Sequence, residues 1–74
     1  MALEETQYRR YEHSQLQNVI IHLLDAEGCI YKKDLQKRLA AHPISLHKAV
    51  KALERKGLVK IIKLNGKPIV CLNI

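Results

Sequence analysis

The sequence is poor in the residues that build metal centres and phosphate-binding loops. It contains two cysteines, Cys29 and Cys71, with no C-x-x-C pair, and its four histidines are not spaced as metal ligands against either of them. The pattern therefore contains no zinc motif. Its three glycines do not form the glycine-rich run that cradles a phosphate group. We therefore expect neither a metal nor another cofactor.

Acidic residues are few and scattered, which argues against an enzyme. The chain has seven Asp and Glu residues, and none is placed to orient the imidazole of His47 beside Ser45. These two side chains therefore form no catalytic triad. A chain of 74 residues is also too small to enclose a substrate. We expect a protein that is not an enzyme, with no evident small-molecule ligand.

Long apolar runs are missing as well. The longest, such as residues 19–21 and 69–72, are far too short to span a bilayer. The N-terminal residues lack the apolar core of a signal peptide. The apolar content of 47% nevertheless indicates one folded domain rather than a disordered chain. We therefore expect a cytoplasmic protein with no membrane partner.

Positive charge is concentrated in the last two thirds of the chain. Residues 1–28 carry two basic side chains against five acidic ones, a net charge of −3. Residues 29–74 carry eleven basic side chains against two acidic ones, a net charge of +9. This asymmetry is typical of a domain whose basic part approaches a polyanion.

The first helix is predicted over residues 14–27. Ser14 and Gln17 fit a capping box, in which each side chain bonds the backbone of the other. Gly28 is suited to end the helix. Residues 1–12 show no sustained period, and we predict a mobile arm, a short added helix or a dimerisation segment. The helical assignment rests on apolar residues spaced three and four apart: Leu16, Val19, Ile20, Leu23 and Leu24.

Two more helices follow a short strand predicted at residues 29–31. The second helix is predicted over residues 32–41 and the third over residues 43–56, ending before Gly57. Pro43 marks the boundary, because proline is favoured at the first helical position and disfavours helical geometry in the residue before it. The third helix has a buried stripe on one side and a basic face on the other. The stripe consists of Leu46, Val50 and Leu53.

A two-stranded hairpin is predicted at the C-terminal end. Residues 58–64 are rich in β-branched side chains, and residues 68–73 form the returning strand. Asn65-Gly66 between them is a strong hairpin signal, because a type I′ turn needs positive φ at both positions. Pro68 has no backbone N–H to donate, so we place it at the start of its strand with its nitrogen facing away from the partner.

This order of elements is that of a winged helix-turn-helix domain. The residues DLQKRLAAHPISLHKAVKALERKGLVKI, followed by a hairpin ending in VCLN, resemble the MarR/ArsR-type winged-helix transcription regulators. The resemblance implies an α+β, mainly α-helical domain over residues 13–74. Tyr31 departs from the family, which usually has Ser or Thr there as a helix cap. The additional dimerisation helices of typical MarR proteins are also missing from this sequence.

A second winged-helix group, the Z-DNA-binding Z-alpha domains, has a similar short wing with a proline near Pro68. Those domains need an Asn and a Tyr on the recognition helix and a Trp after the wing proline. The corresponding residues here are His47, Lys51 and Val70. Because none of the three matches, we do not expect recognition of Z-form DNA.

The resemblance to transcription regulators implies sequence-specific binding of double-stranded DNA. The third helix would enter the major groove, where Lys48 can address guanine O6 or N7, and Ser45 and His47 can donate or accept hydrogen bonds. The residues predicted to meet base edges are Ile44, Ser45, His47 and Lys48. Those predicted to contact the DNA backbone are Lys32, Lys33, Lys51, Arg55, Lys60, Lys63, Asn65 and Lys67. A homodimer is expected, because one small recognition helix specifies few base pairs.

Two alternatives remain open at this point. The same fold also serves as a protein–protein interaction module within larger transcription assemblies, where Lys48 and Lys51 would meet an acidic partner. The resemblance also places the short strand beside the last strand, which brings Cys29 and Cys71 together. We expect two buried, reduced thiols by default, and a disulfide if the source is a hyperthermophile or its virus.

Overall fold

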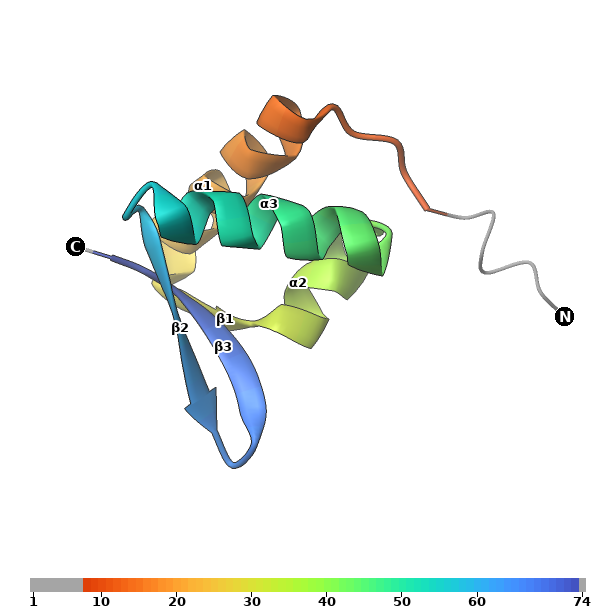
Figure 1. The fold of residues 1–74 in the computed structure, drawn as a ribbon. Helices are drawn as coiled ribbons and strands as arrows, with labels where there is room; N and C mark the ends of the chain where they lie inside the picture. Colours follow the sequence, from red (N-terminus) through yellow and green to blue (C-terminus); the bar gives the residue numbers. More distant parts are fainter. Residues whose placement is uncertain (1–7, 74) are drawn as a thin grey trace, which may run out of the picture.

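Residues 8–73, which the computed structural model describes, fold into three helices and one small antiparallel sheet. The predicted fold class, α+β and mainly α-helical, is confirmed. In Figure 1, α3 crosses in front of α1, and the hairpin extends away from the helices. None of the helices among these residues is long and apolar enough to cross a membrane. The elements are α1 (His13–Glu27), β1 (Cys29–Tyr31), α2 (Lys32–Leu39), α3 (Pro43–Arg55), β2 (Val59–Leu64) and β3 (Lys67–Leu72).

The core lies between the helices and the inner face of the sheet. The stripe predicted on α3 is buried, with side-chain exposures of 1% for Leu46, 1% for Val50 and 2% for Leu53. Burial of such aliphatic side chains is the main favourable contribution to folding, at about 1.5–3 kcal/mol each. Helices and hairpin all contribute large, fully buried side chains: Leu16, Ile20, Leu24, Leu35, Leu46, Val50, Leu53, Val59 and Val70.

The start of α1 differs from the prediction. Glu12 rather than Ser14 is the N-cap residue, and Gln15 completes the capping box, with its Oε1 accepting from the backbone N–H of Glu12 at 3.4 Å. Gln17, which was predicted to close the box, is instead 7% exposed, and its Oε1 accepts from Lys56 Nζ at 2.8 Å. The predicted box was wrong because α1 begins at His13, after Glu12, and the Gln17 side chain bonds Lys56 at the end of α3 instead.

The second helix ends earlier than predicted, at Leu39 rather than at residue 41. Ala40 takes a left-handed conformation with φ of 52°, and Ala41 turns into the core with no exposed surface. An alanine costs about 1–2 kcal/mol in that conformation, so the sequence carries no helix-stop signal there. The helix ends with Ala40 as its C-cap, whose backbone N–H donates to the carbonyls of Gln36 and Lys37.

Residues 8–12 pack against the end of α2. The backbone N–H of Arg9 donates to the carbonyl of Ala40 at 2.8 Å, and the hydroxyl of Tyr11 donates to the carbonyl of Leu39 at 2.7 Å. These residues satisfy carbonyl groups that the end of a helix leaves unpaired. The prediction for residues 1–7 lies outside the described residues.

The sheet has the order β1-β3-β2, so the last strand is its centre. Ile30 of β1, Val70 of β3 and Ile61 of β2 lie side by side and face the core. Asn65 and Gly66 have φ of 53° and 77°, as the hairpin signal predicts. The strands span 59–64 and 67–72, each within one residue of the predicted bounds.

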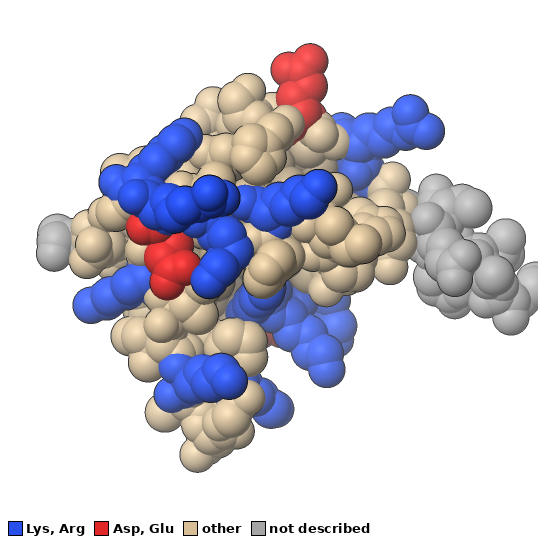
Figure 2. Space-filling view, viewed as in Figure 1, with Lys and Arg blue, Asp and Glu red and all other residues tan. Residues whose placement is uncertain are grey.

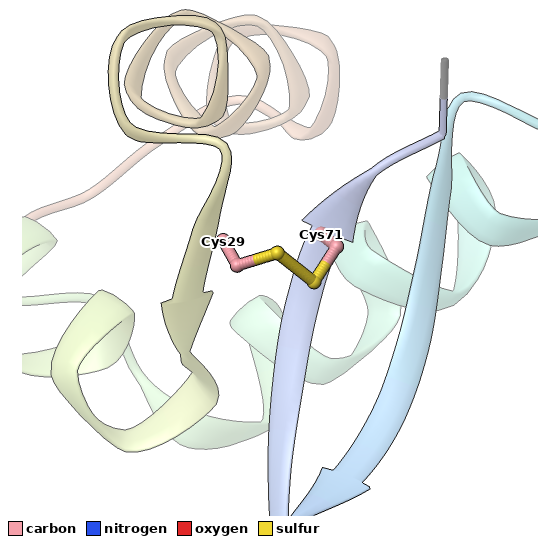
Figure 3. The surroundings of a disulfide bond; sticks show 2 residues. All are labelled: Cys29 and Cys71. Carbon is pink, nitrogen blue, oxygen red and sulfur yellow. A yellow bond between two sulfur atoms is a disulfide. The ribbon is translucent and has the colours of Figure 1, made fainter.

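Cys29 and Cys71 are joined by a disulfide that connects β1 to β3 (Figure 3). They are direct partners across the two antiparallel strands, with Cα atoms 4.1 Å apart. The default expectation of two buried, reduced thiols is therefore wrong, and Cys29 is also exposed. The alternative disulfide is the state found, because strand pairing aligns two residues that are 42 positions apart.

Candidate nucleic-acid interface

The candidate interface is built around the exposed face of α3. The helix begins with Pro43, and the Nδ1 atom of His42 accepts the backbone N–H of Ile44 at 3.2 Å, which caps the first turn. The buried stripe fixes the rotation of the helix, so the opposite side faces solvent. Figure 2 shows Lys and Arg side chains gathered over α3. The predicted contact residues on this exposed side are Ile44, Lys48, Lys51 and Arg55.

The structure separates two of the residues predicted to meet base edges. Ser45 and His47 are both exposed. On an ideal helix, positions two apart lie about 160° from each other around the axis. Ser45 therefore lies on one flank of the exposed face of α3 and His47 on the other, and the two cannot contact the same base edge.

His47 is connected to the start of α2. The Nζ atom of Lys32 lies 3.0 Å from Nδ1 of His47, which joins the first residue of α2 to the middle of α3. Lys32 was predicted as a phosphate contact, and the structure gives its ammonium a protein partner in addition. The sequence does not indicate this contact, because the two residues are 15 positions apart and belong to different helices.

Lys51 also has a partner on its own helix. Its Nζ lies 3.1 Å from a carboxylate oxygen of Glu54, one turn further along α3. Both side chains are exposed by more than a third, at 49% and 39%, so the pair contributes little to stability. Lys48 and Arg55 have no salt bridge within residues 8–73. Their charges remain available to a polyanion.

The hairpin divides the lysines that were predicted to act together. Side chains alternate between the two faces of a strand, so Lys63 projects from the same face as Val59 and Ile61, the face that packs on the helices. Lys60 projects from the opposite face. Lys67 is paired with Leu64 and projects from that opposite face too. The predicted cluster of three lysines is therefore split, and Asn65 lies between them in the turn.

An open groove lies between the starts of α2 and α3 on one side and the tip of the hairpin on the other. Its volume is about 620 Å³, and its lining includes Lys32 and Lys33 of α2 together with Lys67 of the hairpin. One acid, Asp34, also lines it. The groove is suited to a polyanionic backbone because three of its lining residues are lysines. The sequence does not indicate this groove, because residues of α2 and of the hairpin line it together only once β1 has paired with β3.

Arg38, which was not among the predicted contact residues, forms a salt bridge with Glu27. Its guanidinium donates two hydrogen bonds to the carboxylate of Glu27 at the end of α1, one of them 2.9 Å long between Nη1 and Oε1. These hydrogen bonds lower the pKa of Glu27 and raise the pKa of Arg38. Residues 8–73 contain no group of three or more His, Cys, Asp or Glu side chains that could hold a metal ion.

Solved structures that are similar to this chain include a viral protein and a DNA-binding domain. A hypothetical protein from Pyrobaculum spherical virus, PyrSV_gp04, has a TM-score of 0.78 at 26% identity, over 86% of this chain and 41% of that protein. The Zalpha domain of PKZ from Carassius auratus, solved in complex with Z-DNA, has a TM-score of 0.71 at 18% identity, over 81% of this chain and 95% of that domain. The fold is a winged helix.

These likenesses do not extend to a family. No family model matches the sequence, and no curated protein matches it. The MarR/ArsR assignment is therefore not supported beyond the winged-helix fold itself. The chain spans about two fifths of the viral protein, which has 41% of its length covered.

The three positions that distinguish Z-alpha domains can now be placed in this winged helix. His47 and Lys51 are exposed on α3, whereas Val70 is fully buried in the core, with 0% exposure. An aliphatic side chain enclosed by the core cannot contact DNA. The likeness to the Zalpha domain therefore concerns the fold and not these contact residues.

Proposed function

We propose that this chain binds double-stranded DNA through the exposed face of α3, as the DNA-binding domain of a transcription regulator. One observation carries the proposal: Lys48, Lys51 and Arg55 share the exposed side of a helix whose other side is buried. The solved Zalpha domain supports it, because a domain with the same fold is in complex with a nucleic acid.

In the proposed complex with DNA, the N-terminal half of α3 enters the major groove. Ile44, which is 61% exposed in the first turn, is suited to contact a thymine methyl group, and Lys48 can donate to guanine O6 or N7. Lys51 and Arg55 lie further along the helix and would contact phosphates. B-form DNA is the proposed target, since none of the three residues typical of Z-form recognition is present.

The groove beside α3 supplies the second part of the interface. Lys33 and Lys67 border it from α2 and the hairpin, and Lys63 lies on the helical face of the same hairpin. A phosphate backbone that follows this groove would meet the lysines of α2 and Lys67 of the hairpin. Such an arrangement fixes the register of the protein on the duplex without specifying its sequence.

The test is a titration of random-sequence duplex DNA by fluorescence anisotropy at several salt concentrations between about 50 and 200 mM. Neutralising roughly six phosphates per protomer predicts a slope of log K against log salt near −5. Binding at micromolar protein in low salt is expected. A slope near zero would overturn the proposal. Selection of bound sites from a random pool then shows whether binding is sequence-specific and whether the half-sites are symmetric.

A second candidate function is favoured by one observation on the sheet. Tyr31, Ile62 and Leu64 are exposed by 37%, 44% and 50%, and strand alternation places them all on the face away from the helices. Exposed apolar side chains on one face are typical of a protein contact. A homodimer or a larger transcription assembly would use this face while α3 stays open. Sedimentation of the chain and of an Ile62→Ser, Leu64→Ser variant tests it, with dissociation expected for the variant.

A further inference from the structure

The contact between Lys32 and His47 fixes where the imidazole carries its proton. The distance between Lys32 Nζ and His47 Nδ1 is 3.0 Å. A lysine ammonium has three donors and no acceptor, so Nδ1 must be the accepting, unprotonated nitrogen. In a neutral imidazole the proton then lies on Nε2. Lys32 therefore determines which hydrogen-bonding role the second ring nitrogen can take.

We infer that Lys32 makes His47 a donor-only contact to DNA through Nε2–H. In the major groove this group can donate to guanine O6 or N7, adenine N7 or thymine O4, and it cannot accept from the amino groups of cytosine or adenine. The inference deepens the proposed function and rests on it. It also narrows the prediction from sequence, in which His47 could donate or accept.

Lys32 acts here as a positioning residue. It is partly buried at the first position of α2, and its ammonium bonds the ring nitrogen rather than a base. On α3 itself, the charged residue one turn from His47 is Lys51. Its Nζ atom lies 3.1 Å from Oε1 of Glu54. The donor to His47 Nδ1 is therefore supplied from α2, across the boundary between the two helices.

His42 provides a control within the same molecule. Its Nδ1 accepts the backbone N–H of Ile44 at 3.2 Å, so its proton also lies on Nε2. The partner in this case is a main-chain group that no side-chain substitution removes. His22, an exposed residue of α1, gives the reference for an imidazole in solvent.

The tautomer is measured on the ¹⁵N-labelled free protein, in two-bond proton–nitrogen correlation spectra at a pH where the imidazoles are neutral. In the wild type, we expect His47 to show an unprotonated Nδ1 and a protonated Nε2, as His42 does. Lys32→Ala should move the His47 nitrogens toward the averaged shifts of His22 and leave His42 unchanged. Lys32→Arg, which keeps a donor, should restore them. A protonated Nδ1 on His47, or no response to Lys32→Ala, would overturn the inference.

The DNA contact is measured separately, by selecting sites from a random duplex pool with the wild type, Lys32→Ala and Lys32→Arg. The wild type should enrich acceptor-bearing bases at one position, and Lys32→Ala should lose about five-fold of that discrimination, the value of one hydrogen bond. Unchanged discrimination in Lys32→Ala would overturn the contact. If no variant binds DNA, the proposed function fails, whereas the spectra of the free protein still decide the tautomer.

Discussion

The hydroxyl of Tyr11 donates a 2.7 Å hydrogen bond to the main-chain carbonyl of Leu39, the last residue of α2. This bond and the neighbouring one from Arg9 to Ala40 hold the segment before α1 against the turn that leads into α3. The turn before α3 is therefore supported by residues that precede α1.

Replacing Tyr11 by Phe should destabilise the domain by about 1 kcal/mol, because the half-buried hydrogen bond is lost and the ring is kept. For a domain of this size, that corresponds to a fall in Tm of about 4–8 °C. Thermal unfolding followed by circular dichroism measures it. Tyr31→Phe is the matched control, since this hydroxyl makes no side-chain hydrogen bond within residues 8–73. Equal Tm values for the two variants would contradict the assignment.

The disulfide should contribute strongly to stability. It closes a loop with a sequence separation of 42 residues, for which the chain-entropy model gives about 4 kcal/mol. Reductant should therefore lower the urea midpoint of the wild type and leave a Cys29→Ser, Cys71→Ser variant unchanged. Alkylation without reductant should leave the mass of the folded chain unchanged. Labelling of both cysteines under those conditions would show that the bond is absent.

The pair of Glu27 and Arg38 should stabilise the fold only above acidic pH. The pKa of Glu27 is lowered in the folded state, chiefly by the hydrogen bonds from Arg38. Its contribution is therefore present above the unfolded pKa of about 4.3 and is lost as the pH falls through the lower folded value. The effect is small, because the two side chains are 42% and 43% exposed.

Urea denaturation of wild type and Arg38→Gln at several pH values measures this dependence. The wild type should be the more stable at neutral pH, and the difference should close in acid. Lys37→Gln removes the same charge from the same helix and has no salt bridge within residues 8–73, so it serves as the control. If the difference in free energy of unfolding between the wild type and Arg38→Gln stays constant as the pH falls into the acid range, the prediction is contradicted.

The parts of the fold set by local pattern were predictable from the sequence. The stripe of Leu46, Val50 and Leu53 is buried because three- and four-residue spacing places side chains on one side of a helix. The turn at Asn65-Gly66 needs positive φ at both positions, which few other residue pairs allow. The end of α2 at Leu39 was not predictable, because the next residue, Ala40, takes a left-handed conformation that alanine disfavours.

The candidate site was predictable only in part, because some of its contacts depend on tertiary packing. The basic face of α3 follows from helical spacing within one segment. The approach of Lys32 to His47, and of Lys67 to the start of α2, depends on how distant segments pack. Sequence spacing says nothing about such contacts. The exposure of the basic face of α3 could therefore be predicted from the sequence, whereas the neighbours of these cations on other elements could not.

The two faces of the hairpin should differ in their effect on DNA binding. Lys63 lies on the face that packs on the helices, and Lys60 lies on the opposite face. Lys63→Ala should weaken binding to any duplex and reduce the magnitude of the salt slope by about 1. Lys60→Ala removes the same charge from the same strand and should have a smaller effect. Equal losses in anisotropy titrations of the two variants would show that the hairpin meets DNA with both faces.

The two halves of α3 should contribute differently to the sequence specificity of DNA binding. Lys48 lies within the first two turns of α3, the part proposed to meet base edges. Lys48→Ala should therefore relax sequence preference at one position, with a loss of about 1–3 kcal/mol of discrimination between bases. Lys51 lies deeper along the helix and is already shared with Glu54. Lys51→Ala should therefore weaken binding to all sequences alike. Site selection followed by titration of matched and mismatched duplexes distinguishes the two, and a relaxed preference in Lys51→Ala would place the base contact further along the helix than proposed.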